Sequence, residues 1–182
     1  MNRLPHSSDR TLVAGVGNIF LGDDGFGVET VRRLAEERLP EHAEVVDIGV
    51  RGLHLAYQLL DGYDTFVLVD ATARGGAPGT VYLIEPDAAG GIESQDALLD
   101  GHRMSPDAVL SLLETLCSGT GASPPRRTLV VGCEPACVEE GIGLSPPVAA
   151  AVPEAVRLIM GVLRDGKQGS PAPRAAVGEA AK

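Results

Sequence analysis

Two aspartates and one histidine are the residues whose types and positions best suit hydrolytic or metal chemistry. Asp24 lies in a glycine-rich loop, Asp70 directly follows the most apolar strand-like run, and His102 precedes a helix-start signal. Two carboxylates and an imidazole suit a divalent cation with open coordination positions, which could be presented to a peptide carbonyl. The alternatives are that Asp70 accepts a hydrogen bond from a neighbouring loop and that His102 is a surface residue.

The loop that carries Asp24 also invites comparison with a nucleotide-binding loop. The segment 15–18 (Gly-Val-Gly-Asn) follows a predicted strand and precedes a predicted helix. The third glycine of a dinucleotide-binding pattern is missing, because Phe20 takes its place. Asp23 and Asp24 would also repel a pyrophosphate at the helix N-terminus. We interpret one of this pair as a helix cap that favours the helix dipole and the other as a site residue.

Other chemical motifs are weaker. The segment 133–137, which begins and ends with cysteine, has the wrong spacing for a zinc knuckle and lacks a second ligand pair. Ser105 lies close to His102, but a helix-capping role before Pro106 explains it. The sequence contains no G-x-S-x-G, H-E-x-x-H or P-loop motif. We therefore expect structural roles for these residues.

Strand and helix patterns alternate along the chain and predict how the candidate residues are positioned. The run 65–69 is apolar almost throughout, which indicates a strand buried on both faces of a parallel sheet. Ligands bind at the carboxyl edge of such sheets, where Asp70 falls. Strands are predicted at 11–16, 43–48, 65–69, 80–84 (at an edge) and 129–132, and helices at 28–39, 53–60, from 105 onward and at 148–163. The pattern predicts a three-layer α/β/α sandwich with a mostly parallel twisted sheet.

Two prolines set further expectations for the helices. Pro40 should end the first helix, and Pro153 should kink the last helix or split it.

Length and charge bound the remaining possibilities. The 182 residues fit a single catalytic domain over 11–164, with a flexible leader at 1–10 and a disordered tail at 165–182. The net charge of −10 argues against nucleic acid as a partner. We expect no membrane association and no signal peptide. Three cysteines form no disulfide framework, so reduced thiols in a cytoplasmic protein are expected. A monomer is the simplest arrangement.

Several segments together resemble the hydrogenase maturation protease family. The resemblance spans about Thr11 to Leu163, and its first and last motifs are specific. The segments are Gly15-Val16-Gly17-Asn18, Leu21-Gly22-Asp23-Asp24-Gly25-Phe26-Gly27-Val28, Val46-Asp47-Ile48-Gly49, Val67 to Ala71, His102-Arg103-Met104-Ser105, Gly132-Cys133-Glu134-Pro135 and Gly141-Ile142-Gly143-Leu144-Ser145-Pro146-Pro147-Val148.

The resemblance implies a phosphorylase/hydrolase-like fold and a set of site residues. Asp24, Asp70 and His102 match the family's metal site, and the two aspartates match its catalytic acids. Asn18 and Asp47 match positions linked to substrate recognition. The family often has Glu at the position of Asp24, and Gly-Thr usually follows the position of Asp47. Asp24 in place of Glu shortens one metal ligand by a methylene. The different residues after Asp47 concern which hydrogenase the protease selects.

The implied activity is removal of the C-terminal extension from a nickel–iron hydrogenase large-subunit precursor after nickel insertion. Nickel would be a recognition element carried by the substrate and held weakly by the protease alone. Hydrolysis would be of the aspartic type or metal-assisted. Two other classes are considered: a non-catalytic chaperone that reads the metal-loaded subunit, and a nucleotide-dependent enzyme. Retention of all three site residues argues against the first, and the incomplete glycine pattern argues against the second.

Overall fold

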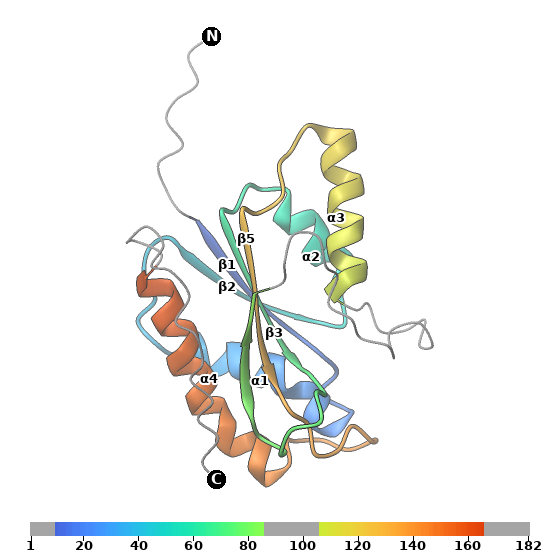
Figure 1. The fold of residues 1–182 in the computed structure, drawn as a ribbon, viewed down its shortest axis with the longest axis vertical. Helices are drawn as coiled ribbons and strands as arrows, with labels where there is room; N and C mark the ends of the chain where they lie inside the picture. Colours follow the sequence, from blue (N-terminus) through green and yellow to red (C-terminus); the bar gives the residue numbers. More distant parts are fainter. Residues whose placement is uncertain (1–9, 86–105, 166–182) are drawn as a thin grey trace, which may run out of the picture.

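The computed structural model describes residues 10–85 and 106–165, and in this part of the chain a sheet of five strands lies between two pairs of helices (Figure 1). In chain order the elements are β1 (Thr11–Val16), the 3₁₀ turn η1 (Gly22–Gly25), α1 (Phe26–Leu34), β2 (Ala43–Gly49), α2 (Gly52–Leu59), β3 (Thr65–Ala71), β4 (Val81–Ile84), α3 (Pro106–Thr120), β5 (Arg127–Cys133) and α4 (Pro146–Asp165). The α/β sandwich predicted from the sequence is confirmed.

The sheet brings the ends of its central strands to one edge. The strand order is β2-β1-β3-β5-β4, in which all neighbours are parallel except the edge strand β4, which runs antiparallel to β5. In this register Val69 lies opposite Gly15 of β1, and Asp70 lies opposite Gly132 of β5. The carboxyl ends of β1, β3 and β5 therefore meet, and the loops that follow them share one end of the molecule.

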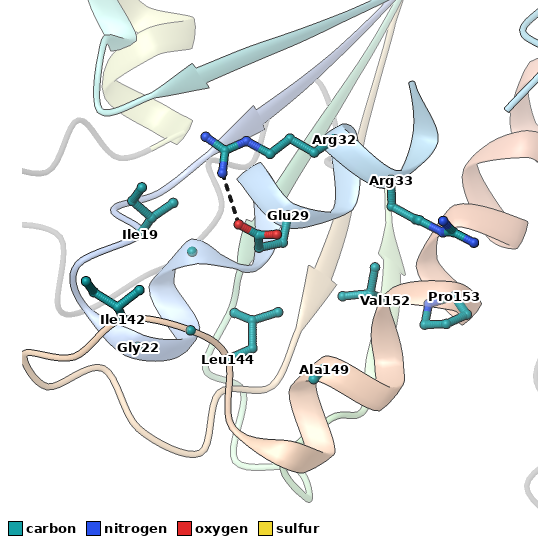
Figure 2. Close-up of a pocket in the computed structure, with 12 residues that line it drawn as sticks. Ile19, Gly22, Glu29, Arg32, Arg33, Ile142, Leu144, Ala149, Val152 and Pro153 are labelled. Carbon is teal, nitrogen blue, oxygen red and sulfur yellow. Dashed lines mark hydrogen bonds and ion pairs between the residues drawn. The ribbon is translucent and has the colours of Figure 1, made fainter. Parts of the chain in front are cut away.

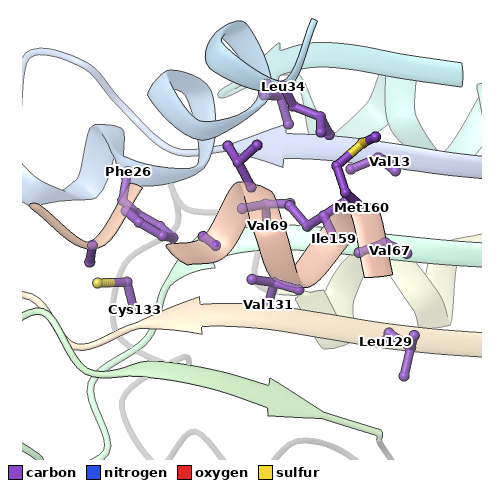
Figure 3. Packing of buried hydrophobic residues seen from close by; sticks show 14 of the residues in the cluster. Val13, Phe26, Leu34, Val67, Val69, Leu129, Val131, Cys133, Ile159 and Met160 are labelled. Atoms are coloured by element: carbon purple, nitrogen blue, oxygen red, sulfur yellow. The ribbon is translucent and has the colours of Figure 1, made fainter. Parts of the chain in front are cut away.

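Each face of the sheet is covered by its own hydrophobic cluster, because alternate side chains of a strand point to opposite faces. In β3, Val67 and Val69 belong to the cluster under α1 and α4, whereas Phe66 and Leu68 belong to the cluster on the side of α2 and α3. Figure 3 shows the first cluster, in which Ile159 and other α4 side chains lie over the valines of the central strands. A strand buried on both faces explains why β3 reads as continuously apolar.

Helix α1 packs unusually close to the ends of β1 and β3. A Cβ atom at Gly27 would overlap the carbonyl oxygens of Val69 and Val16, so only glycine fits this contact. The helix ends at Leu34 and not near Pro40 as predicted. The chain continues from Leu34 in turns, in which the Glu36 N–H bonds to the residue three positions earlier, and these residues are exposed. The apolar pattern continues to Leu39, but Leu39 is only partly buried and residues 35–38 are exposed, so little burial favours a helix past Leu34.

Helix α4 is continuous through Pro153, so the predicted split is wrong. Proline removes the hydrogen bond that the carbonyl of Ala149 would accept. Both residues are exposed, so water can solvate that carbonyl. By length and composition alone α4 could also cross a membrane. Its buried face belongs to the core, as expected for a core helix, and consists of Val148, Ala151, Ala155, Val156, Ile159, Met160 and Leu163.

Candidate active site

The loop between β1 and α1 folds back on itself so that the Asp24 carboxylate meets the backbone N–H of Asn18. The N–H of Asn18 donates to the Asp24 carboxylate at 2.8 Å, and the N–H of Gly17 donates to the carbonyl of Gly49 at the end of β2 at 3.0 Å. Gly17 has a φ of 124°, and a Cβ atom there would overlap the Asp24 carbonyl oxygen. The glycines of this loop thus allow the backbone to pack closely around an acidic side chain. A phosphate-binding loop would instead direct free N–H groups at its ligand.

Asp70 lies in the last residues of β3 and is half-buried. The turn η1, which carries Asp24, packs against β3. The fold therefore brings the two elements that hold the predicted catalytic acids into contact at the carboxyl edge of the sheet. His102, the predicted third ligand, lies outside the described residues, as does Ser105. Among the residues that the structure describes, no group of three His, Cys, Asp or Glu side chains is placed to bind a metal ion.

Asp47 lies at the same edge of the sheet, on β2 opposite Gly15. Its carboxylate accepts a hydrogen bond from Nε of Arg32 at 3.2 Å, and Arg32 also pairs with Glu29 at 3.1 Å. Arg32 is exposed and its two acidic partners are partly exposed, and ion pairs that solvent reaches contribute little to stability. Asp47 is therefore accessible and can exchange Arg32 for another partner, as its predicted role in substrate recognition requires.

Asp23 has a role that the sequence did not reveal. No side-chain hydrogen bond caps η1 or α1, so the predicted helix cap is wrong. Asp23 is instead fully buried and accepts hydrogen bonds from the N–H groups of Ala136, Cys137 and Ser145 and from the Ser145 hydroxyl. Burial acts to raise the pKa of Asp23, but these hydrogen bonds outweigh it and lower the pKa. The only sign of this role in the sequence was the pair of adjacent aspartates, because the hydrogen-bond donors of Asp23 are more than a hundred residues further along the chain.

The segment after β5 holds a second buried carboxylate. Glu134 is 5% exposed and accepts hydrogen bonds from the N–H of Arg74 at 2.8 Å, the N–H of Gly75 at 3.1 Å and the hydroxyl of Tyr82 at 2.8 Å. Burial acts to raise the pKa of Glu134, but its hydrogen bonds lower it below the ordinary value. Glu134 thereby fastens the turn after β3 to β4 and β5, which is a structural role.

The two cysteines of this region differ in exposure, because Cys133 is buried and Cys137 is exposed. Cys133 is fully buried, and desolvation together with the nearby carboxylates of Asp23 and Glu134 raises its pKa to about 12. All three cysteines of the chain, Cys117, Cys133 and Cys137, are free.

A groove of about 570 Å³ runs between α1, α4 and the loop before α4 (Figure 2). Its apolar lining includes Ile19, Ile142 and Leu144, while Arg32 and Arg33 of α1 line the opposite side. Beside the groove, Phe20 is 61% exposed and Ile142 is 83% exposed. The two segments that carry these residues are joined by the bond from the Gly141 N–H to the Phe20 carbonyl at 2.9 Å. Apolar side chains are thus exposed together next to the Asp24 loop.

Comparison with known proteins identifies the same family from several directions. Residues 28–162 match the family model described as hydrogenase maturation protease. The hydrogenase 2 maturation protease of Escherichia coli K12 is 32% identical over 158 residues, which cover 86% of this chain and 92% of that protein. The hydrogenase expression/formation protein HupD of Rhizobium leguminosarum bv. viciae is 32% identical over 162 residues, covering 88% of this chain and 77% of that protein.

Solved structures agree with the sequence comparison. The hydrogenase maturating endopeptidase HybD of E. coli superimposes with a TM-score of 0.68 at 29% identity, covering 86% of this chain and 93% of that one. A hydrogenase 2 maturation peptidase from a Thaumarchaeota archaeon gives a TM-score of 0.63 at 31% identity, with coverages of 85% and 97%. The family model covers most of the described residues, from α1 to α4, and two relatives are 32% identical over most of the chain, so this chain belongs to the hydrogenase maturation protease family.

Proposed function

We propose that this protein is the endopeptidase that removes the C-terminal extension of a nickel–iron hydrogenase large-subunit precursor after nickel insertion. The proposal includes recognition of the substrate's nickel by Asp24, Asp70 and His102. We place the reaction in the cytoplasm, where a reducing environment suits the three unpaired cysteines. The partner is the large-subunit precursor, which the family implies as substrate.

The observation that carries the proposal is the contact between η1 and β3, which bear Asp24 and Asp70. Carboxylates and an imidazole are suitable donors for nickel. The Asn18 N–H holds one oxygen of the Asp24 carboxylate at 2.8 Å, so this acid is oriented before the substrate arrives. Asp24, oriented in this way, and Asp70 on the neighbouring strand are suited to meet a metal that the substrate brings to the carboxyl edge of the sheet.

Hydrolysis requires a water to add to the scissile carbonyl, and the peptide C–N bond then breaks as the leaving amine takes a proton. An aspartate of the pair can accept the proton of the attacking water as general base and return it to the amine. Polarisation of the carbonyl by the substrate's nickel is the other route. Both routes place Asp24 and Asp70 next to the scissile bond.

The apolar surface beside the Asp24 loop supports a protein substrate. Phe20 and Ile142 are exposed on two segments that are bonded to each other, and adjacent exposed apolar side chains often mark a protein interaction site. We propose that these two side chains contact the large-subunit precursor next to the cleavage site.

The test is cleavage of a nickel-loaded large-subunit precursor, with the nickel-free precursor in parallel. Loss of the C-terminal extension is followed by intact mass. The variants are Asp24→Asn, Asp70→Asn and His102→Ala. Asp61→Asn is the matched control, because Asp61 is exposed and lies just before β3, at the opposite end of that strand from Asp70.

We expect cleavage of the nickel-loaded precursor alone, loss of cleavage in the three site variants, and wild-type cleavage by Asp61→Asn. Binding of the precursor without cleavage would replace the protease with the chaperone. Equal cleavage of both precursors would contradict nickel recognition, and wild-type rates in Asp24→Asn or Asp70→Asn would contradict the assignment of the acids.

A further inference from the structure

The buried carboxylate of Asp23 connects the Asp24 loop to a distant part of the chain. Its exposed fraction is 0%. Oδ2 accepts hydrogen bonds from the N–H of Ala136 at 2.8 Å, from the N–H of Cys137 at 3.0 Å and from the Ser145 hydroxyl at 2.8 Å. Oδ1 accepts a hydrogen bond from the Ser145 N–H at 2.6 Å. One side chain thus gathers both ends of the segment 136–145.

Backbone hydrogen bonds align the middle of that segment with the same loop. The N–H of Gly22 donates to the carbonyl of Gly141 at 2.9 Å, and the N–H of Asp23 donates to the carbonyl of Cys137 at 2.9 Å. A parallel bridge pairs Leu21 with Gly141. The segment 136–145 therefore holds η1 in place through backbone hydrogen bonds and through the side chain of Asp23.

The residue that follows Asp23 is the candidate catalytic acid. Both belong to the same four-residue 3₁₀ turn, so a shift of the Asp23 backbone moves the Asp24 backbone with it. The Asp24 carboxylate is in turn oriented by the Asn18 N–H, a bond whose geometry depends on the same turn. We infer that Asp23 is a positioning residue, which holds Asp24 in its productive place by fixing η1 to the segment 136–145. This inference rests on the proposed peptidase function.

Charge and hydrogen bonding both matter for this role. A carboxylate can accept all four bonds at once, whereas an asparagine side chain offers one oxygen and places an NH₂ group against backbone N–H donors. Asp23→Asn therefore keeps the shape of the side chain and removes part of the attachment. Small displacements of a catalytic group are costly, since a shift of about 1 Å can reduce a rate about 100-fold.

Glu134 provides the matched control. It is also a buried carboxylate bound by two backbone N–H groups and a hydroxyl, but these donors lie in the turn after β3 and in β4 and belong neither to η1 nor to the segment 136–145. Glu134→Gln should therefore destabilise the fold by the same kind of loss without moving Asp24. A purely structural role for Asp23 would make the two variants behave alike per folded molecule.

The experiment combines kinetics with amide hydrogen exchange on the full-length protein. In Asp23→Asn we expect kcat for the nickel-loaded precursor to fall about 100-fold. We also expect faster exchange of the Asn18 amide, which reports the Asp24 bond. Glu134→Gln should keep the wild-type kcat and the wild-type exchange of the Asn18 amide. Ser145→Ala, which removes one of the four bonds, should show a smaller change of the same kind as Asp23→Asn.

A wild-type kcat per folded molecule in Asp23→Asn, or unchanged exchange of the Asn18 amide, would overturn the inference. Equal loss of kcat in Glu134→Gln would also overturn it. If Asp23→Asn does not fold, Ser145→Ala carries the test. If the wild-type protein cleaves no precursor, the proposed function fails, and the exchange of the Asn18 amide still decides whether Asp23 positions the turn.

Discussion

Gly27→Ala offers a direct test of how α1 is seated on the sheet. A Cβ atom at this position would overlap the carbonyl oxygens of Val69 and Val16 and would lie 2.9 Å from the nitrogen of Val16. All three are backbone atoms, so no side-chain rotation can relieve the overlap. The helix must move away from the ends of β1 and β3.

The expected cost follows from two opposing effects. Overpacking of this kind costs about 3 kcal/mol at the upper end of its usual range. Alanine regains up to about 1 kcal/mol of helix propensity. The net loss in the free energy of unfolding is therefore about 2 kcal/mol, which lowers Tm by about 4–8 °C in a chain of this length. Because α1 directly follows η1, the displacement should also reduce cleavage of the precursor.

Gly161→Ala is the matched control for this prediction. Gly161 lies inside α4, and a Cβ atom there would meet no atom within 4 Å. The substitution should therefore stabilise the protein by about 0.5–1 kcal/mol. Urea unfolding followed by circular dichroism measures both variants under the same conditions. Stabilisation by Gly27→Ala, or the same effect from both substitutions, would refute the described packing of α1.

Three further predictions concern other residues. Glu134→Gln should lower the free energy of unfolding at pH 7 by about 1.5–3 kcal/mol, because hydrogen bonds to a charged group are lost. The folded-state pKa of Glu134 lies below its ordinary value of 4.5, so the stabilisation by its carboxylate is present above pH 4.5 and is lost as the pH falls through the folded-state pKa. Urea unfolding should therefore show that the free energy of unfolding changes less between pH 7 and pH 4 in the variant than in the wild type. An equal change in both proteins would refute this. Thiol labelling of the native protein at pH 8 should modify Cys137, which is exposed, and leave Cys133 unmodified, because the pKa of Cys133 is raised to about 12. Rapid labelling of Cys133 would contradict its burial. Ile142→Ser should raise KM for the precursor about tenfold, because burial of an isoleucine side chain contributes about 1.5–3 kcal/mol. It should not lower the stability of the free protein, in which Ile142 is 83% exposed. An unchanged KM would show that the precursor does not cover this side chain.

The sequence predicted those features that depend on local pattern. The continuous apolar run of β3 indicated a strand buried on both faces, and the structure places Val67 and Phe66 in the two opposite clusters. The pattern at 148–163 predicted the last helix, which the structure gives as α4 over Pro146–Asp165. These signals are short-range, so they could be recognised without knowledge of the fold.

Features that depend on distant contacts could not be predicted in this way. The helical pattern of α1 extends past Leu34, but the helix ends where its buried face ends, and that point is set by the sheet and α4. The role of Asp23 depends on donors at 136–145, and nothing near Asp23 in the sequence identifies them. Gly27 is required by the carbonyl of Val69, a contact that exists only when α1 lies across β3.

The attachment of Asp23 also has a consequence for biosynthesis. Its hydrogen bonds to Ser145 join residues that are 122 positions apart, and long loops of this kind close only after both ends have been made. A nascent chain that has completed β1, α1 and β3 already contains Asp24 and Asp70, but it lacks the segment that fixes η1. Under the proposed function the acid pair is therefore assembled late, when nearly the whole domain has left the ribosome, and an incomplete chain is expected to have no protease activity.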